Sequence, residues 1–79
     1  MTTAGKELKA ARLSKNLQLE DVSRSTKIKP IFLEYIENGE YQKLPSDSYA
    51  HGFVRNYALF LGLDEKEIMA LFYVILPQI

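Results

Sequence analysis

Four aromatic residues lie close together in the stretch YAHGFVRNYALFLGL, which spans residues 49–63. They are Tyr49, Phe53, Tyr57 and Phe60, and this spacing places them on one side of a helix. Aromatic rings so arranged either fill a hydrophobic core or form an exposed surface that binds another protein. The chemistry that this stretch offers is therefore apolar recognition.

Residues that could support catalysis or metal binding are scarce. The chain has no cysteine and one histidine, His51. It has no glycine-rich phosphate loop, and no pair of carboxylates stands apart from ordinary helix-surface charge. We therefore expect no enzymatic activity, no cofactor and no metal site.

The composition is that of an ordinary globular protein, with 47% hydrophobic and 25% charged residues and a net charge of zero. The first residues, MTTAGKELKAAR, lack the apolar segment of a signal peptide. The longest apolar run, residues 69–76, is far shorter than the roughly 18 residues of a membrane span. We expect a soluble chain that is not exported and that forms one domain over residues 1–79.

Apolar residues recur at helical spacing, and no segment alternates as a strand would, so the predicted fold is all-α. Pro30 favours a helix start, Ser46 and Asp64 are good N-caps, and Gly62 favours a helix end. Gln18 is a poor N-cap. Five helices are predicted, at about 4–15, 19–25, 30–37, 47–61 and from the Asp64 cap to about Leu76.

Each of the first three predicted helices has a candidate buried stripe. The expected inward residues are Leu8, Ala11 and either Leu13 or the stem of Lys15, then Leu19 and Val22, then Ile36 with either Phe32 or Leu33.

The second and third helices have the spacing of a helix-turn-helix, so a DNA-binding transcriptional regulator is the alternative function. A recognition helix reads base edges with polar side chains in its first turn. Here that turn reads KPIFL, which has nothing suited to specify a base. Lys27 and Lys29 could make weak contacts with phosphate, but the zero net charge argues against strong nucleic-acid binding.

Several segments together resemble the cytoplasmic N-terminal domain of the RodZ family, bacterial cell-shape proteins, over nearly the whole chain. The similar segments are LKAAR at 8–12, LQLEDV at 17–22, TKI at 26–28, LEYIENGEYQKLP at 33–45 and YAHGFVRNYALFLGLD at 49–64. The resemblance implies a five-helix bundle with a degenerate helix-turn-helix. It also implies binding to the actin-like filament protein MreB through the fourth helix. The expected location is the cytoplasmic face of the cell membrane, joined to it by a C-terminal span that these residues do not contain.

The fourth helix has an apolar arc wider than the core-facing stripe of a surface helix. With Tyr49 at 0°, Phe60, Phe53 and Tyr57 fall at about 20°, 40° and 80°. Small and aliphatic residues follow, at about 100° to 180°: Ala50, Leu61, Val54 and Ala58. The arc is therefore about 180° wide, against roughly 100° for an ordinary buried face.

Two interpretations of the aromatic half remain. The fifth helix could cover it with Ile68, Leu71 and Phe72, or part of it could stay exposed as a binding surface. The family resemblance favours Phe53 and Tyr57 as the pair that faces the partner, together with Phe60. Tyr49 is then expected in the core with its hydroxyl hydrogen-bonded.

Polar neighbours and a glycine complete the prediction for this helix. Arg55 and Asn56 could supply hydrogen bonds at the rim of the binding surface or could simply be solvated. His51 is expected to be exposed or half-exposed. Gly52 is unfavourable in mid-helix, so another backbone is expected to come close to it, either from within the domain or from the partner.

Overall fold

The predicted helices are all present in a computed structural model of the chain, which describes residues 2–75 and the side chains of residues 2–73. Residues 2–75 contain no strand, so the all-α class is confirmed. The helices are α1 (Ala4–Ser14), α2 (Leu19–Thr26), α3 (Pro30–Glu37), α4 (Asp47–Leu61) and α5 (Glu65–Ile75), with a short 3₁₀ turn at Tyr41–Lys43. The predicted end of α5 near Leu76 lies outside the described residues.

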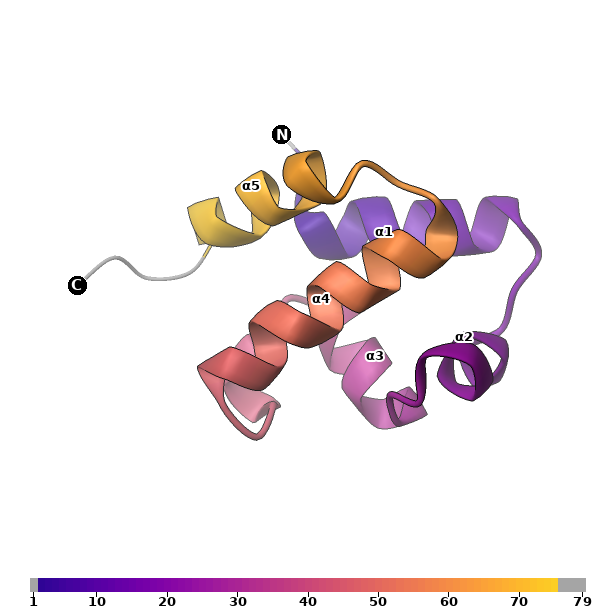
Figure 1. The fold of residues 1–79 in the computed structure, drawn as a ribbon, viewed down its shortest axis with the longest axis horizontal. Helices are drawn as coiled ribbons and strands as arrows, with labels where there is room; N and C mark the ends of the chain where they lie inside the picture. Colours follow the sequence, from indigo (N-terminus) through magenta and orange to yellow (C-terminus); the bar gives the residue numbers. More distant parts are fainter. Residues whose placement is uncertain (1, 76–79) are drawn as a thin grey trace.

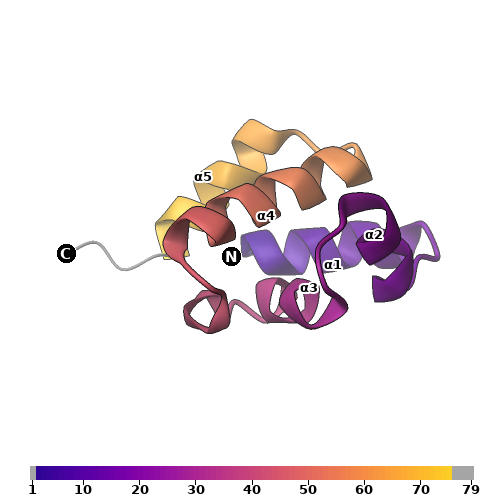
Figure 2. The same ribbon diagram turned by 60° about the horizontal axis from the view of Figure 1, so that its bottom comes forward.

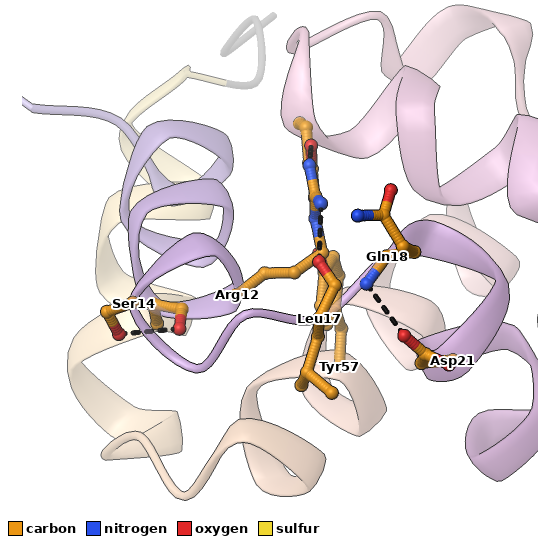
Figure 3. Close-up of polar contacts among 8 residues, drawn as sticks. Arg12, Ser14, Leu17, Gln18, Asp21 and Tyr57 are labelled. Carbon is orange, nitrogen blue, oxygen red and sulfur yellow. Dashed lines mark hydrogen bonds and ion pairs between the residues drawn. The ribbon is translucent and has the colours of Figure 1, made fainter.

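Helix boundaries follow the cap residues. The hydroxyls of Thr3 and Ser46 accept hydrogen bonds from the backbone N–H groups of Lys6 and Tyr49. The Asp64 carboxylate accepts the backbone N–H of Lys66 at 2.9 Å. At the start of α2, a side chain inside the helix bonds back to the N-cap residue. The Asp21 carboxylate accepts the backbone N–H of Gln18 at 2.8 Å (Figure 3).

Helix α4 crosses the middle of the fold and contacts every other helix, and α1 contacts α3, α4 and α5 (Figure 1). Figure 2 shows α4 and α5 side by side above α1, with α3 below it and α2 at the right of the view. The helix-turn-helix formed by α2 and α3 is thus held against α1 and α4.

Every one of the five helices contributes to a single core. The most fully buried large side chains are Leu8, Val22, Leu33, Ile36, Val54, Tyr57 and Phe72. Leu33 is the core residue of α3, and Phe32 is only half-buried at the edge of the core.

The inward face of α1 differs from the prediction. Leu8 is buried, but Leu13 is 53% exposed and Lys15 is also exposed. Arg12 is buried instead, about 40° from Leu8 around the helix, whereas Leu13 is about 140° away. Periodicity alone would not place an arginine in the core, because burying a charge requires a partner.

Gly5 explains how closely α1 approaches α3. A Cβ at this position would lie 2.4 Å from the Ile36 carbonyl oxygen and 2.6 Å from that of Glu37. The positive N-terminal end of α1 therefore meets the negative C-terminal end of α3, an arrangement that the helix dipoles favour. Gly5 is needed because any side chain would collide with that backbone.

Candidate functional site

The buried face of α4 is its small and aliphatic half. Ala50, Val54, Ala58 and Leu61 are all buried, as the chemical division of the helix predicted. These short side chains allow α4 to lie close to α1 and α5. The surface available for binding must therefore come from the other half of the helix.

Tyr57 was expected to face a partner, and this is wrong because the side chain is fully buried. Its hydroxyl donates a hydrogen bond to the Glu37 carboxylate on α3. At about 80° Tyr57 lies closer to the centre of the buried aliphatic face, near 120°, than to the aromatic edge at 0°. The tertiary fold therefore assigns this ring to the core.

A buried ion pair explains why a tyrosine is needed at position 57. The Arg12 guanidinium donates to both Glu37 carboxylate oxygens, at 2.7 and 3.0 Å, and to the Leu17 carbonyl at 2.9 Å. Figure 3 shows Arg12 and Leu17 close to Tyr57. Burial and then the hydrogen bond to Glu37 raise the pKa of Tyr57 well above its usual range. This network joins α1, α3 and α4 and fixes the orientation of α4.

Tyr49 was expected in the core, and this is also wrong, because its side chain is 55% exposed. Phe60, on the same side of α4, is 38% exposed, and Phe53 between them is half-buried. Of the aromatic residues of α4, Tyr49 and Phe60 are thus exposed and Phe53 is partly exposed. The exposed part of the aromatic half is therefore shifted around the helix from the predicted one, with Tyr49 in place of Tyr57.

Helix α5 does not cover these rings. Its Phe72 packs edge-on against Tyr41, with ring centroids 4.9 Å apart, and lies 6.5 Å from His51. His51 is exposed, as predicted, and it lies about 200° around α4 from Tyr49. The interpretation in which Ile68, Leu71 and Phe72 bury the aromatic half is therefore wrong.

Helix α3 extends the aromatic side of α4 instead. The Phe53 ring lies between Tyr49, at 5.5 Å, and Phe32 of α3, which stacks on it at 5.8 Å. We call Tyr49, Phe53, Phe60 and Phe32 the aromatic surface. Sequence reasoning missed Phe32 because it could not decide whether Phe32 or Leu33 entered the core.

The polar residues predicted for the rim are both exposed. Asn56 lies about 20° from Tyr49 around the helix, so it borders the aromatic surface. Arg55 lies farther round, and its Nε donates to the Glu65 carboxylate at 2.6 Å. Such an exposed ion pair is weak.

Gly52 does not serve internal packing. A Cβ at this position would meet no atom within 4 Å outside the local helix backbone. The prediction that another part of the domain approaches Gly52 is therefore wrong, and the alternative in which the partner does so remains. Replacing a mid-helix glycine with alanine ordinarily stabilises a helix by about 0.5–1 kcal/mol, so this position carries an uncompensated cost within the domain.

Lys27 and Lys29 flank the turn of the helix-turn-helix, and both are exposed. Lys27 adopts the left-handed conformation with φ of 65°. The Lys29 ammonium lies 5.9 Å from the centre of the Phe32 ring, a cation–π contact. The first turn of α3 also exposes Ile31, and Glu34 beside it is exposed as well. This turn is a poor surface for reading bases.

Within residues 2–75, no three His, Cys, Asp or Glu side chains come together as a metal site would require. Over the same residues, no helix combines the length and the apolar character needed to cross a bilayer.

A protein family, related sequences and a solved structure all identify the same kind of domain. A family described as a helix-turn-helix domain matches residues 7–68. The cytoskeleton protein RodZ of Streptococcus pneumoniae is 31% identical over 67 residues, which cover 85% of this chain and 24% of that protein. The membrane protein YmfM of Bacillus subtilis is 33% identical over 52 residues, 66% of this chain and 18% of that protein.

A solved structure is also similar. YmfM from Staphylococcus aureus, described as a candidate DNA-binding membrane protein, superposes with a TM-score of 0.90 at 30% identity, covering 98% of this chain and 94% of that one. The curated relatives are far longer, because the present chain spans less than a quarter of either one. With the family match, the shared fold and the RodZ relative in agreement, the chain belongs to this helix-turn-helix family as a RodZ-like domain.

Proposed function

We propose that this domain is a non-enzymatic interaction module that binds filaments of an MreB-like actin homologue through α4. In a longer protein it would link those filaments to the membrane from the cytoplasmic side. The observation that carries the proposal is the exposure of Tyr49 and Phe60 on a helix whose core-facing positions are already filled.

The exposure of these aromatic rings is better explained by binding to another molecule than by a role in folding. A soluble domain rarely leaves neighbouring large apolar side chains in water without an interaction role. Tyrosine and other large rings supply much of the energy at protein interfaces, because each buries a large area with little loss of conformational freedom. The relative named as a cytoskeleton protein supports a filament as the partner.

Membrane anchoring would compensate for a weak individual contact. Two or three aromatic contacts on one helix bury too little surface for tight binding by a single copy. Many copies tethered along one filament would bind with a raised effective concentration. A modest affinity of the isolated domain is therefore consistent with the proposed role.

DNA binding is the second candidate, because the fold contains a helix-turn-helix and one structural relative is described as a candidate DNA-binding protein. Lys27 and Lys29 are the residues that would contact phosphate. The exposed first turn of α3 favours the filament instead, since Ile31 and the half-buried Phe32 lack hydrogen-bonding groups for base edges.

The test is co-sedimentation of the purified domain with polymerised MreB. Tyr49→Ala and Phe60→Ala should each fold normally, because these rings are exposed, and each should weaken pelleting by roughly tenfold or more if the ring is a hot spot. Leu13→Ala is the matched control, since Leu13 is as exposed as Tyr49 but lies on α1. The proposal fails if the parent domain stays in the supernatant or if all three variants pellet like the parent.

A further inference from the structure

The turn between α2 and α3 carries positive charge that the proposed function does not use. Residues 22–33 contain Arg24, Lys27 and Lys29 and no acidic residue. Figure 1 shows this turn at the lower edge of the domain, on the far side from α5. The three basic side chains are exposed, and so is Ile31, which follows them at the start of α3. We call Arg24, Lys27, Lys29 and Ile31 the basic tip.

The charges of the basic tip are largely free for an external partner. Within residues 2–73, no carboxylate forms an ion pair with the ammonium of Lys27 or of Lys29. Arg24 contacts Asp21 at 3.4 Å, but both side chains are exposed and the contact is long. Such a pair contributes little. An anion that approaches the tip would therefore meet three cations with little competition from the domain itself.

Lys27 occupies a position where glycine would suit the fold better. It follows the last turn of α2 with φ of 65° and ψ of 19°, the left-handed conformation that glycine adopts without cost. Backbone strain of this kind is concentrated at functional positions. A lysine at this position adds charge to the tip at the expense of the stability of the domain.

The apolar part of the basic tip indicates what kind of anion it fits. Ile31 is 45% exposed, and the Lys29 ammonium lies over the half-buried ring of Phe32. In DNA, the groups beside the phosphates are base edges, which these apolar side chains cannot read. At a bilayer surface, an aliphatic side chain can enter the boundary of the acyl chains while lysine ammonium groups stay among the head groups. Free cations beside an exposed isoleucine therefore favour a lipid surface over DNA.

We propose that the basic tip binds the surface of a membrane that contains anionic phospholipids. Lys27 and Lys29 contact the head-group phosphates, Arg24 adds to the attraction, and Ile31 enters the boundary of the acyl chains. Each cation held near such a surface strengthens binding by roughly fivefold. The tip adjoins the aromatic surface at Phe32, so a membrane and a partner of α4 would contact neighbouring sides of the domain.

Co-sedimentation of the purified chain with lipid vesicles tests the proposal without any filament, so the result is independent of the proposed function. At low ionic strength, the parent should bind vesicles of equal parts phosphatidylglycerol and phosphatidylcholine, and it should not bind vesicles of phosphatidylcholine alone. Lys27→Gln and Lys29→Gln should each lower the partition coefficient by roughly fivefold. Lys27→Arg/Lys29→Arg should retain binding, because it keeps both charges.

The matched control is Lys6→Gln/Lys9→Gln, which removes the same charge from exposed positions of α1. This variant should bind the anionic vesicles like the parent. The proposal is wrong if the parent does not bind them, if it binds neutral vesicles equally well, or if loss of Lys27 and Lys29 has no more effect than loss of Lys6 and Lys9.

Ile31→Ala distinguishes a lipid surface from DNA. It should weaken binding to the anionic vesicles several-fold, because less apolar area enters the bilayer. Binding to random duplex DNA, measured by fluorescence anisotropy in the same buffer, should be weaker than vesicle binding and unchanged by Ile31→Ala. Tighter binding to the duplex than to the vesicles would assign the tip to nucleic acid and overturn the proposal.

A fluorescent label shows which face meets the bilayer. Because the chain has no cysteine, Ser25→Cys beside the tip and Ser48→Cys on α4 can each carry one environment-sensitive fluorophore at an exposed position. Anionic vesicles should shift the emission of the label at residue 25 to shorter wavelength and leave the label at residue 48 unchanged. An equal or larger shift at residue 48 would place another face on the membrane and contradict the proposal.

Discussion

The Tyr57 hydroxyl on α4 donates a hydrogen bond to the Glu37 carboxylate at the end of α3, inside the core. Arg12 holds the same carboxylate from α1. Three helices distant in sequence are therefore joined by polar contacts that work only at one relative orientation. The aromatic surface owes its direction to this network, because the network determines which side of α4 is buried.

The contrast between two buried tyrosines gives the first prediction. Tyr57→Phe should lower the free energy of unfolding by about 1–3 kcal/mol, because it removes a hydrogen bond to a buried charged group. The Tyr41 hydroxyl is buried without a hydrogen-bond partner. Tyr41→Phe should therefore raise stability by roughly 1 kcal/mol, since it removes an unsatisfied polar group. Urea unfolding of both variants measures the two signs, and a loss of stability in Tyr41→Phe would contradict the account of that hydroxyl.

The same tyrosines predict a loss of stability at alkaline pH. Burial raises the pKa of Tyr41, and burial with the hydrogen bond to Glu37 raises that of Tyr57, from the ordinary value of 10.0. Above pH 10 the unfolded chain loses these protons before the folded chain does, so stability falls as pH rises. The contribution is fully present below pH 10 and is lost as pH rises toward the folded-state pKa values.

Comparison with the double variant Tyr41→Phe/Tyr57→Phe isolates this effect, because both proteins keep every other tyrosine and every lysine. Above pH 10 the parent should lose up to about 1.4 kcal/mol per pH unit more for each tyrosine. Parallel stability curves for the two proteins between neutral and alkaline pH would show that neither hydroxyl contributes.

Gly5 and Gly52 should respond oppositely to the same substitution. Gly5→Ala places a methyl group 2.4 Å from the Ile36 carbonyl oxygen, so it should lower stability by about 1–3 kcal/mol or prevent folding. Gly52→Ala should raise stability by about 0.5–1 kcal/mol. Thermal melting monitored by circular dichroism measures both. Equal shifts of one sign would mean that the α1–α3 contact is looser than the structure shows.

Lys27 and Lys29 offer a matched test of backbone strain. Lys27 has φ of 65°, where a side chain costs about 1–2 kcal/mol, so Lys27→Gly should raise the melting temperature by a few degrees. Lys29 has φ of −59°, and Lys29→Gly should lower the melting temperature because glycine only adds unfolded-state entropy there. A lower melting temperature for Lys27→Gly would contradict the strain.

The DNA alternative can be tested separately from the filament. We expect no sequence-specific binding at physiological salt, because the first turn of α3 is apolar and the net charge is zero. A mobility-shift selection from random duplexes should enrich no motif. Nanomolar enrichment of one motif that is weakened by Lys29→Ala would favour transcriptional regulation over the filament.

Local chemistry determined the helices and most of their ends. Pro30, Ser46, Asp64 and Gly62 act through hydrogen bonds or dihedral angles within one turn, so their effect can be inferred from neighbouring residues alone. The five-helix all-α fold and its helix-turn-helix followed from those signals and from periodicity. The aliphatic half of α4 was also identified correctly, since small side chains at helical spacing favour close packing.

Tertiary structure alone decided which aromatic side chains are exposed. Tyr57 and Tyr49 exchange their expected roles because Glu37 and Arg12, from other helices, supply the buried polar partners that a tyrosine hydroxyl needs. Likewise, the exposure of Leu13 follows from burial of Arg12, which no periodicity would predict. A helix sequence specifies an apolar arc, but the part of a wide arc that faces the core depends on the partners that the rest of the chain brings to it.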